Sequence, residues 1–268
     1  MKKSPFYFFH LLVSDSHSLI SESQTNSRKG HSPFSFLLFP FLLWLLPLFS
    51  FAQETYPSFL PAEAIPNGAK YLPAPPDTAS MNFFNDWVQY NWGKSLRDTP
   101  RGRQAIRDAS MDADSILLGF SEAFGQPLST AATPAISYVI NRVLTSSYHA
   151  TKSAKKHFNR KRPFVQYNEG TLIPSEEASH VHSGSYPSSH SSAGWAVALV
   201  LAELNPAHQE AILKRGYEYG QSRVIAGYHY QSDVDIARLA ASAAVARLHS
   251  EPSFTKAMIK AKREVLEK

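Results

Sequence analysis

The distribution of proline constrains the fold of this chain more than any other feature of its sequence. Residues 53–80 contain six prolines, which are Pro57, Pro61, Pro66, Pro73, Pro75 and Pro76. A proline removes a backbone donor and clashes with the preceding helical turn, so this density excludes long helices and disfavours central strands. From residue 82 onward, apolar residues recur at helical spacing. The sequence therefore predicts an extended, wrapping arm followed by a helical domain.

Several stretches of helical length follow the arm. The first cover residues 83–92 and 104–124, a third opens at Thr133-Pro134, and a basic run at 148–161 ends before Pro163. A long connection at residues 164–187 comes next, and its length favours a functional role. Four further helices are predicted at residues 191–204, 206–225, 232–248 and 253–266. Strand signals are nearly absent, which predicts a single all-α domain at residues 53–268.

An apolar run at residues 34–51 precedes the arm. It reads FSFLLFPFLLWLLPLFSF, follows Arg28 and Lys29, and ends beside the small residue Ala52. This pattern predicts a secretory signal cleaved after Ala52, so that residues 1–52 form an N-terminal extension and signal peptide. A bacterial-style signal of this kind directs a protein to the periplasm or the medium. The alternative is a membrane anchor, because the run is near the shortest length that spans a bilayer; its internal prolines favour cleavage.

Charge and composition exclude several classes of protein. The chain has no cysteine, which excludes disulfides, thiolate metal sites and cysteine nucleophiles. Residues 53–268 contain 23 Lys and Arg against 20 Asp and Glu, an excess of +3 within the +5 of the whole chain. That excess does not indicate a nucleic acid polymer as partner, although a local cluster of cations could bind an anionic substrate. After Ala52 no apolar stretch approaches about twenty residues, so no stable membrane insertion is expected after cleavage.

The first of three candidate site segments is the basic run that ends at Arg162-Pro163. Lys155 lies seven residues before Arg162, which is two turns along one helical face, so both cations could point at one anion. The alternative is a solvated basic helix end that complements the helix dipole.

The second segment, residues 184–191, stands immediately before the apolar run 195–201. Ser188 and Ser189 at a helix start would offer hydroxyls and unpaired backbone N–H groups, which can form a phosphate cradle. Simple N-capping is the alternative. His190 lies in the mouth of this cradle, where an imidazole can hold a proton near neutral pH.

The third segment contains Arg223, His229 and Asp233. If the segment is helical, the four-residue step would place the Asp233 carboxylate beside the His229 ring, holding one nitrogen and leaving the other as nucleophile or base. Arg223 would supply another cation for an anion. A surface salt bridge is the alternative for the His–Asp pair.

Taken together, the three segments resemble a known signature. The patterns Lys155-x6-Arg162-Pro163, Pro187-Ser188-Ser189-His190 and Ser222-Arg223-x5-His229-x3-Asp233 resemble that of the type 2 phosphatidic acid phosphatase superfamily. Bacterial non-specific acid phosphatases, membrane lipid phosphatases and vanadium haloperoxidases share this signature. Short flanking segments are similar to the class A secreted acid phosphatases in particular, at residues 184–187, 213–217 and 220–223. The resemblance runs from about residue 60 to 268. It implies the single helical domain of the type 2 phosphatidic acid phosphatase and vanadium haloperoxidase kind.

The resemblance also implies a role for each matching residue. The non-bridging phosphate oxygens would be held by Lys155, Arg162, Ser188 and Arg223, with backbone N–H groups near Ser189 and His190. His229 would attack phosphorus and become a phosphohistidine while Asp233 holds its tautomer. His190 would protonate the leaving alcohol and then activate water, so it must begin protonated, which favours an acidic optimum. This chemistry needs no metal and no cofactor.

Ser189 departs from the family pattern, which usually has glycine at this position. A side chain there could crowd a phosphate oxygen or force an altered φ, whereas a serine hydroxyl could add a donor. We expect activity to survive this change.

The resemblance implies small phosphate monoesters, such as nucleotides and sugar phosphates, as substrates, with possible transfer of the phosphoryl group to other alcohols. It also implies a homo-oligomer. Two alternatives stay open: a vanadium-dependent haloperoxidase-like enzyme, and a non-catalytic phosphate-binding protein. No metal site is predicted at His157, His180 or His182.

Overall fold

Prolines and short polar caps begin most of the helices in the computed structural model, which describes residues 57–266. Thr99 and Pro100 begin α2, and Pro134, Pro163 and Pro252 stand first in three others. The described α-helices are α1 (Met81–Ser95), α2 (Pro100–Arg107), α3 (Ala113–Phe124), α4 (Pro134–Phe158), α5 (Pro163–Tyr167), α6 (Glu177–His180), α7 (Ser189–Leu204), α8 (Gln209–Ile225), α9 (Gln231–Leu248) and α10 (Pro252–Leu266).

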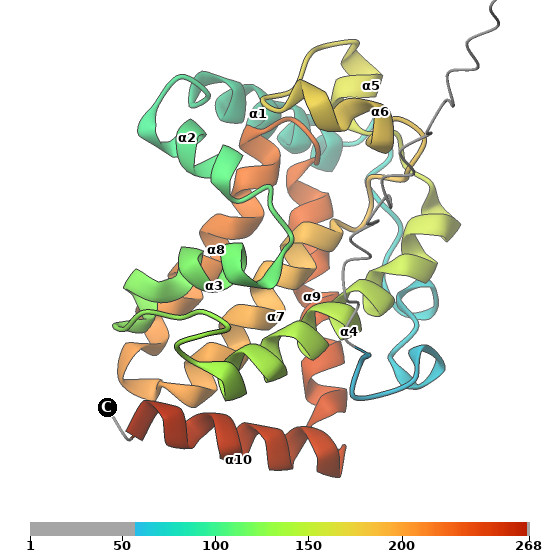
Figure 1. Cartoon of the computed structure of the whole chain (residues 1–268). Helices are drawn as coiled ribbons and strands as arrows, with labels where there is room; N and C mark the ends of the chain where they lie inside the picture. The colour runs from blue at the N-terminus through green and yellow to red at the C-terminus, as the bar shows by residue number, and fades with distance from the viewer. Residues whose placement is uncertain (1–56, 267–268) are drawn as a thin grey trace, which may run out of the picture. The chain divides into compact units, whose positions relative to one another are not determined.

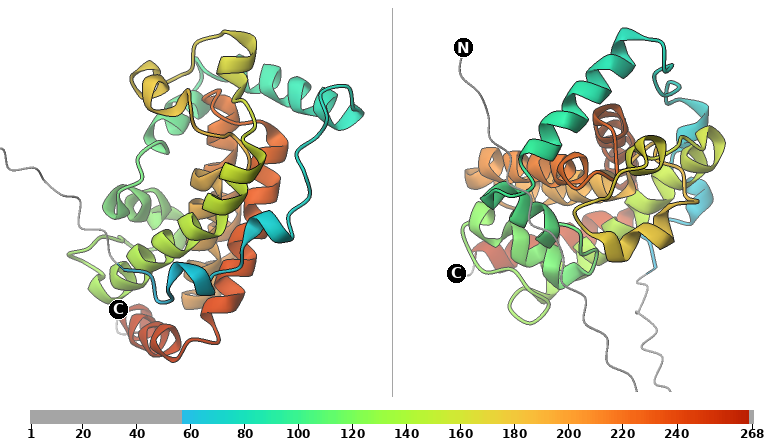
Figure 2. Two further views of the ribbon diagram at one scale, coloured as in Figure 1. Left: turned by 90° about the vertical axis from the view of Figure 1, so that its right-hand side faces the viewer. Right: turned by 90° about the horizontal axis from the view of Figure 1, so that it is seen from above.

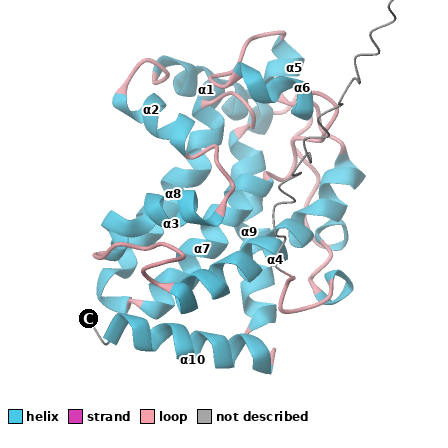
Figure 3. Cartoon of the chain, viewed as in Figure 1, coloured by secondary structure: helices cyan, strands magenta, loops and turns pink. Residues whose placement is uncertain are grey.

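Residues 57–266 contain no strand (Figure 3), so the prediction of an all-α fold is confirmed. No helix among these residues is long and apolar enough to cross a bilayer. The predicted signal and the division of the chain at Ala52 lie outside the described residues.

Helix α7 is the centre of the fold. Its side chains are apolar on most sides, and Val197, Val200 and Leu201 are completely buried. A helix with this pattern requires neighbours all round, and α4, α8 and α9 pack against it. Figure 1 shows α10 crossing one end of this bundle, while α1, α5 and α6 lie at the other end.

Two glycines let α7 and α8 approach closely. A Cβ atom on Gly216 would stand 2.3 Å from the Cβ of Ala198, and one on Gly194 would stand 2.3 Å from the Tyr219 ring. Both separations are far below van der Waals contact, so only glycine permits this packing. Because α7 and α8 are antiparallel neighbours, the beginning of α7 lies beside the end of α8.

The proline-rich arm runs alongside α4 in space, as Figure 2 shows. Ser58 Oγ and Ser146 Oγ are 2.6 Å apart, and the Tyr186 hydroxyl donates to the carbonyl of Pro73 over 2.8 Å. The arm contains two single turns of 3₁₀ helix, at Ala62–Ala64 and Gly68–Lys70. Between these turns and α1 the chain is extended, as its prolines predict.

The helix bounds differ from the predicted ones in three places. The predicted helix at 104–124 is two helices, α2 and α3, and the two runs predicted after Pro134 are one helix, α4. The connection at 164–187 contains two short helices, α5 and α6, and a 3₁₀ turn at Pro174–Glu176.

Candidate active site

Lys155 and Arg162 reach the same carbonyl from different elements. Helix α4 ends at Phe158, Asn159 takes a positive φ of 41°, and Arg162 is the extended residue before α5. The prediction that both cations share one helical face is therefore wrong. They converge nonetheless, because Lys155 Nζ and Arg162 Nη2 donate to the Gly184 carbonyl over 2.9 and 3.4 Å.

The guanidinium of Arg223 is the least compensated charge of the site. The side chain is completely buried at the end of α8, and none of its three nitrogens has a hydrogen-bond partner among the described residues. One face of the guanidinium covers the Tyr228 ring, 4.5 Å from the centroid. Glu176 Oε2 is 3.7 Å from Nη2, beyond hydrogen-bonding distance. Burial of a charge without hydrogen bonds is costly, so the natural partner of this group is an oxyanion.

Burial lowers the pKa of each of the three cations, and repulsion from neighbouring cations lowers those of Lys155 and Arg162 further. Burial, followed by the charges of Arg162 and Arg223, lowers the pKa of Lys155 to about 7. Burial and Arg223 lower the pKa of Arg162 to about 10. Burial also lowers the pKa of Arg223. A doubly charged anion among these side chains would relieve both the burial cost and the repulsion.

His229 presents one ring nitrogen to these cations. Its Nδ1 is 3.4 Å from Asp233 Oδ2 and 3.3 Å from Ser185 Oγ, whereas its Nε2 is 3.0 Å from Arg162 Nη1. Ser185 gives its own hydroxyl proton to Asp233, so Nδ1 is the donor in this cluster and Nε2 carries the lone pair. Burial and the charges of Arg162 and Lys155 lower the pKa of His229 well below its usual value, which favours this neutral ring.

The contact between His229 and Asp233 does not arise from a shared helix. Helix α9 begins at Gln231, after His229, so the condition attached to the predicted pair is not met. Asp233 instead accepts from the Tyr230 backbone N–H over 2.9 Å as part of a capping box, which turns its carboxylate back toward the histidine.

Three supporting residues were missed by sequence reasoning. Arg160 Nη1 donates to Asp233 Oδ1 over 2.7 Å, and Arg160 Nη2 donates to Asp86 Oδ2 over 2.8 Å. Ser185 holds the other Asp233 oxygen. Arg160 is visible in the sequence only as one member of a basic run, and Asp86 stands 74 residues away. The single available signal was the position of Arg160 and Ser185 inside the matching segments.

The two serines at the start of α7 have different partners. Ser188 is the N-cap, and its buried hydroxyl accepts from the Ser191 backbone N–H over 3.3 Å. Its own N–H donates to the main-chain carbonyl of Asp233 over 3.0 Å. Ser189 Oγ is 2.9 Å from Thr151 Oγ1. Ser189 does not have a positive φ, so the side chain at this position does not force the backbone into the left-handed region.

His190 is held by a main-chain carbonyl. Its Nε2 is 2.9 Å from the Ala109 oxygen, which can only accept. Nε2 therefore carries a proton, and in the neutral ring Nδ1 carries the lone pair. Burial, Arg223 and His229 lower the pKa of His190 well below its usual value. A phosphate dianion beside Arg223 would oppose the electrostatic part of this shift and favour the protonated ring.

The matching family model is described as the PAP2 superfamily, and it covers residues 128–251, which include all eight predicted site residues. A non-specific acid phosphatase of Providencia stuartii is 49% identical over 194 residues, which are 72% of this chain and 78% of the relative. A non-specific acid phosphatase of Salmonella typhimurium is 37% identical over 233 residues, or 85% and 93% of the two chains. An acid phosphatase of Zymomonas mobilis is 37% identical over 195 residues, or 73% and 74%. By these similarities and its all-helical fold, the chain belongs to the PAP2 superfamily and, within it, to the class A bacterial acid phosphatases.

Proposed function

We propose that this protein is an acid phosphatase that hydrolyses phosphate monoesters through a phosphohistidine intermediate. The observation that carries the proposal is the geometry at His229. Its Nε2 lone pair faces Arg162 Nη1 at 3.0 Å, and its Nδ1 is backed by the buried Asp233. The same site contains Arg223, whose buried guanidinium has no hydrogen-bond partner among the described residues. An imidazole in this environment is a nucleophile aimed at the place where a phosphoryl group would bind.

In the first chemical step, Lys155, Arg162 and Arg223 hold the non-bridging oxygens, together with N–H groups at the start of α7. His229 Nε2 attacks phosphorus, and the bond from phosphorus to the ester oxygen breaks. His190 gives its proton to that oxygen, so a neutral alcohol leaves. Asp233 stabilises the positive charge that develops on the His229 ring.

In the second step the same groups act in reverse. The now neutral His190 takes a proton from water, and the hydroxide attacks phosphorus as the bond to His229 breaks. Inorganic phosphate is released, and an alcohol in place of water would give phosphotransfer. The positive charge in the site comes from side chains, so the proposed chemistry requires no metal ion or other cofactor.

The pH dependence follows from His190, which must begin the first step protonated. Its surroundings hold its pKa well below the ordinary value, so the protonated form becomes abundant only in acid. We therefore propose an acidic optimum for turnover.

The proposal extends to the location, the substrates and the assembly of the enzyme. The apolar run at residues 34–51 favours export to the periplasm or the medium, with cleavage after Ala52. Nucleotides and sugar phosphates are the proposed substrates, and a homo-oligomer the proposed assembly. Site roles are proposed for His229, His190 and Asp233 in catalysis, and for Lys155, Arg162, Ser188, Ser189 and Arg223 in phosphate binding.

Replacement of His229 by Ala tests the proposal. With p-nitrophenyl phosphate in acidic buffer containing a chelator, we expect the variant to lose about 10³-fold or more in kcat, and acid-quenched samples to lose the phosphohistidine label. The control is His157→Ala, which removes an exposed histidine from α4 and should leave kcat unchanged. Retained turnover by His229→Ala would exclude it as the nucleophile.

The two alternatives have distinct results in the same experiment. A haloperoxidase-like enzyme would oxidise bromide when vanadate and peroxide are added and would turn over the monoester poorly. A non-catalytic binder would bind inorganic phosphate without releasing p-nitrophenol.

A further inference from the structure

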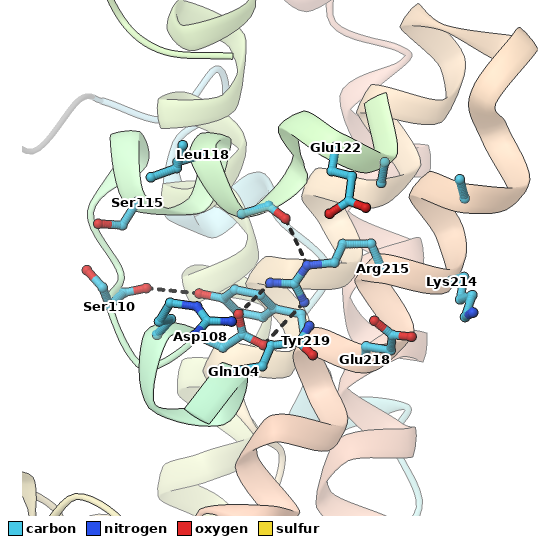
Figure 4. A pocket seen from close by; sticks show the side chains of 14 residues that line it. Gln104, Asp108, Ser110, Ser115, Leu118, Glu122, Lys214, Arg215, Glu218 and Tyr219 are labelled. Carbon is cyan, nitrogen blue, oxygen red and sulfur yellow. Dashed lines mark hydrogen bonds and ion pairs between the residues drawn. The ribbon is translucent and has the colours of Figure 1, made fainter. Parts of the chain in front are cut away.

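The turn that follows α2 contacts both the candidate site and α8. Asp108, Ala109 and Ser110 form this turn, and each of its three residues has a different partner. The Asp108 carboxylate accepts from Arg215 and from Ser222, the Ala109 carbonyl lies against His190, and the Ser110 carbonyl accepts from the Tyr219 hydroxyl. Figure 4 shows Asp108 and Ser110 approached by Arg215 and Tyr219 from α8.

These groups line a pocket of about 850 Å³ between α2, α3 and α8. Figure 4 draws the side chains that line it. None of the eight predicted site residues lines that pocket. The turn therefore separates the pocket, which Asp108 and Ser110 line, from His190, which contacts the Ala109 carbonyl.

The ion pair between Asp108 and Arg215 fixes the position of this turn. Both carboxylate oxygens accept from the guanidinium, one of them over 3.2 Å, and Asp108 is 4% exposed. Arg215 Nε also donates to the Gly119 carbonyl over 2.8 Å, which ties α3 to the same group. Ser222 Oγ donates to Asp108 over 2.5 Å, one residue before Arg223. A bidentate, buried pair of this kind defines both distance and orientation.

The Ala109 carbonyl is the single hydrogen-bond partner of the His190 ring among the described residues. Its position therefore decides which ring nitrogen carries the permanent proton and where the other nitrogen points. Within residues 57–266, no side chain holds a ring nitrogen of His190 as Asp233 holds one of His229.

We propose that Asp108 and Arg215 are positioning residues for His190: by fixing the Ala109 carbonyl, they make the ring present Nδ1 to the leaving oxygen. This inference rests on the proposed phosphatase function. It assigns the orientation of the proposed general acid, His190, to residues other than the phosphate-binding cations.

A change in the position of His190 should affect substrates differently according to their leaving group. An alkyl oxygen leaves phosphorus only with a proton, whereas p-nitrophenolate is stable enough to leave without one. A misplaced His190 should therefore slow the cleavage of alkyl phosphates more than that of p-nitrophenyl phosphate. The ratio kcat/KM covers the steps up to phosphohistidine formation, so the later attack by water does not enter the comparison.

The test compares kcat/KM for p-nitrophenyl phosphate and for a primary alkyl phosphate in Asp108→Asn and Arg215→Lys. We expect the alkyl value to fall about tenfold more than the aryl value in Asp108→Asn, and by a smaller excess in Arg215→Lys, which keeps the charge. Asp235→Asn removes an exposed aspartate that pairs with Arg238 and serves as the control. It should change neither value.

Equal losses for the two substrates in Asp108→Asn, or no loss, would overturn the inference. If that variant does not fold, Tyr219→Phe removes the hydroxyl bond to Ser110, together with a long contact to Met111 Sδ, and should shift the ratio in the same direction. An unchanged ratio there also overturns the inference. His190→Ala separates the two proposals. If it lacks the leaving-group signature, the proposed role of His190 fails; if it has the signature and the Asp108 and Tyr219 variants lack it, only the positioning inference fails.

Discussion

Ser189 shows how a single side chain can differ from its family without distorting the backbone. Its hydroxyl is 2.9 Å from Thr151 Oγ1, and its φ is not positive. We therefore expect Ser189→Gly to change kcat/KM for p-nitrophenyl phosphate by less than about threefold. Stability should fall by ~1 kcal/mol, because glycine costs backbone entropy at a helix start and the hydroxyl bond is lost.

Steady-state kinetics and thermal unfolding check this prediction together, with Ser189→Ala as the variant that removes the hydroxyl alone. A rise of more than about tenfold in kcat/KM for Ser189→Gly but not for Ser189→Ala would mean that the side chain crowds the phosphate.

At the residue scale, sequence patterns predict the residues proposed to contact the substrate, but not the residues that support them. Lys155, Arg162 and His229 belong to segments with recognisable spacing, and the structure places them together. Asp86 and the Ala109 carbonyl act through contacts that span 74 and 81 residues, and such contacts depend on the folded path of the chain. A main-chain carbonyl in addition has no residue type by which a sequence could reveal it.

At the scale of helices, the crossing of α7 and α8 should be sensitive to any added side-chain volume. A methyl group on Gly216 would meet Ala198 at 2.3 Å. We expect Gly216→Ala to destabilise the protein by ~1–3 kcal/mol, because the two backbones must separate. The melting temperature should fall by roughly 2–4 °C for each kcal/mol in a chain of this size.

Gly170→Ala is the matched control, since a Cβ at Gly170 would have nothing within 4 Å. Melting temperatures that fall equally in the two variants would show that the crossing tolerates the added methyl group.

Helix positions were largely predictable from apolar spacing, and the errors have local causes. The two runs predicted after Pro134 form the single helix α4 because Ser146, Ser147 and Thr151, although buried, bond to carbonyls of their own helix. Polar residues at core positions hide a helical pattern when their hydrogen bonds are satisfied locally. The division between α2 and α3 is marked by Asp112, whose side chain caps α3. Alanine and isoleucine on both sides of it conceal this boundary.

At the scale of the whole molecule, the buried bases should make the stability of the phosphate-free protein rise with pH. The pKa values of His190 and His229 are lowered from 6.5, and that of Lys155 from 10.5 to about 7. The unfolded chain therefore binds more protons than the folded one, first below pH 6.5 through the histidines and then between about pH 7 and 10.5 through Lys155. The free energy of unfolding should increase across both ranges.

The stabilisation that inorganic phosphate provides should instead be larger at low pH, because phosphate binds best when these groups are protonated. Thermal unfolding from pH 5 to 9, with and without phosphate, checks both trends. Lys155→Met should flatten the curve above pH 7. A melting temperature that falls from pH 5 to 6.5 without phosphate would contradict the assignment of neutral histidines.

Asp233 takes part in the structure through both its main chain and its side chain, since it holds the start of α7 by its carbonyl and Arg160 by its carboxylate. This double attachment bears on how the protein can evolve once selection for turnover is relaxed. Substitutions at His229 or His190 would remove the two groups proposed to carry the chemistry, whereas loss of Asp233 would also leave Arg160 with one fewer counter-charge. Descendants that retain only anion binding should therefore be recognisable by altered histidines beside an unchanged pair of Asp233 and Arg160.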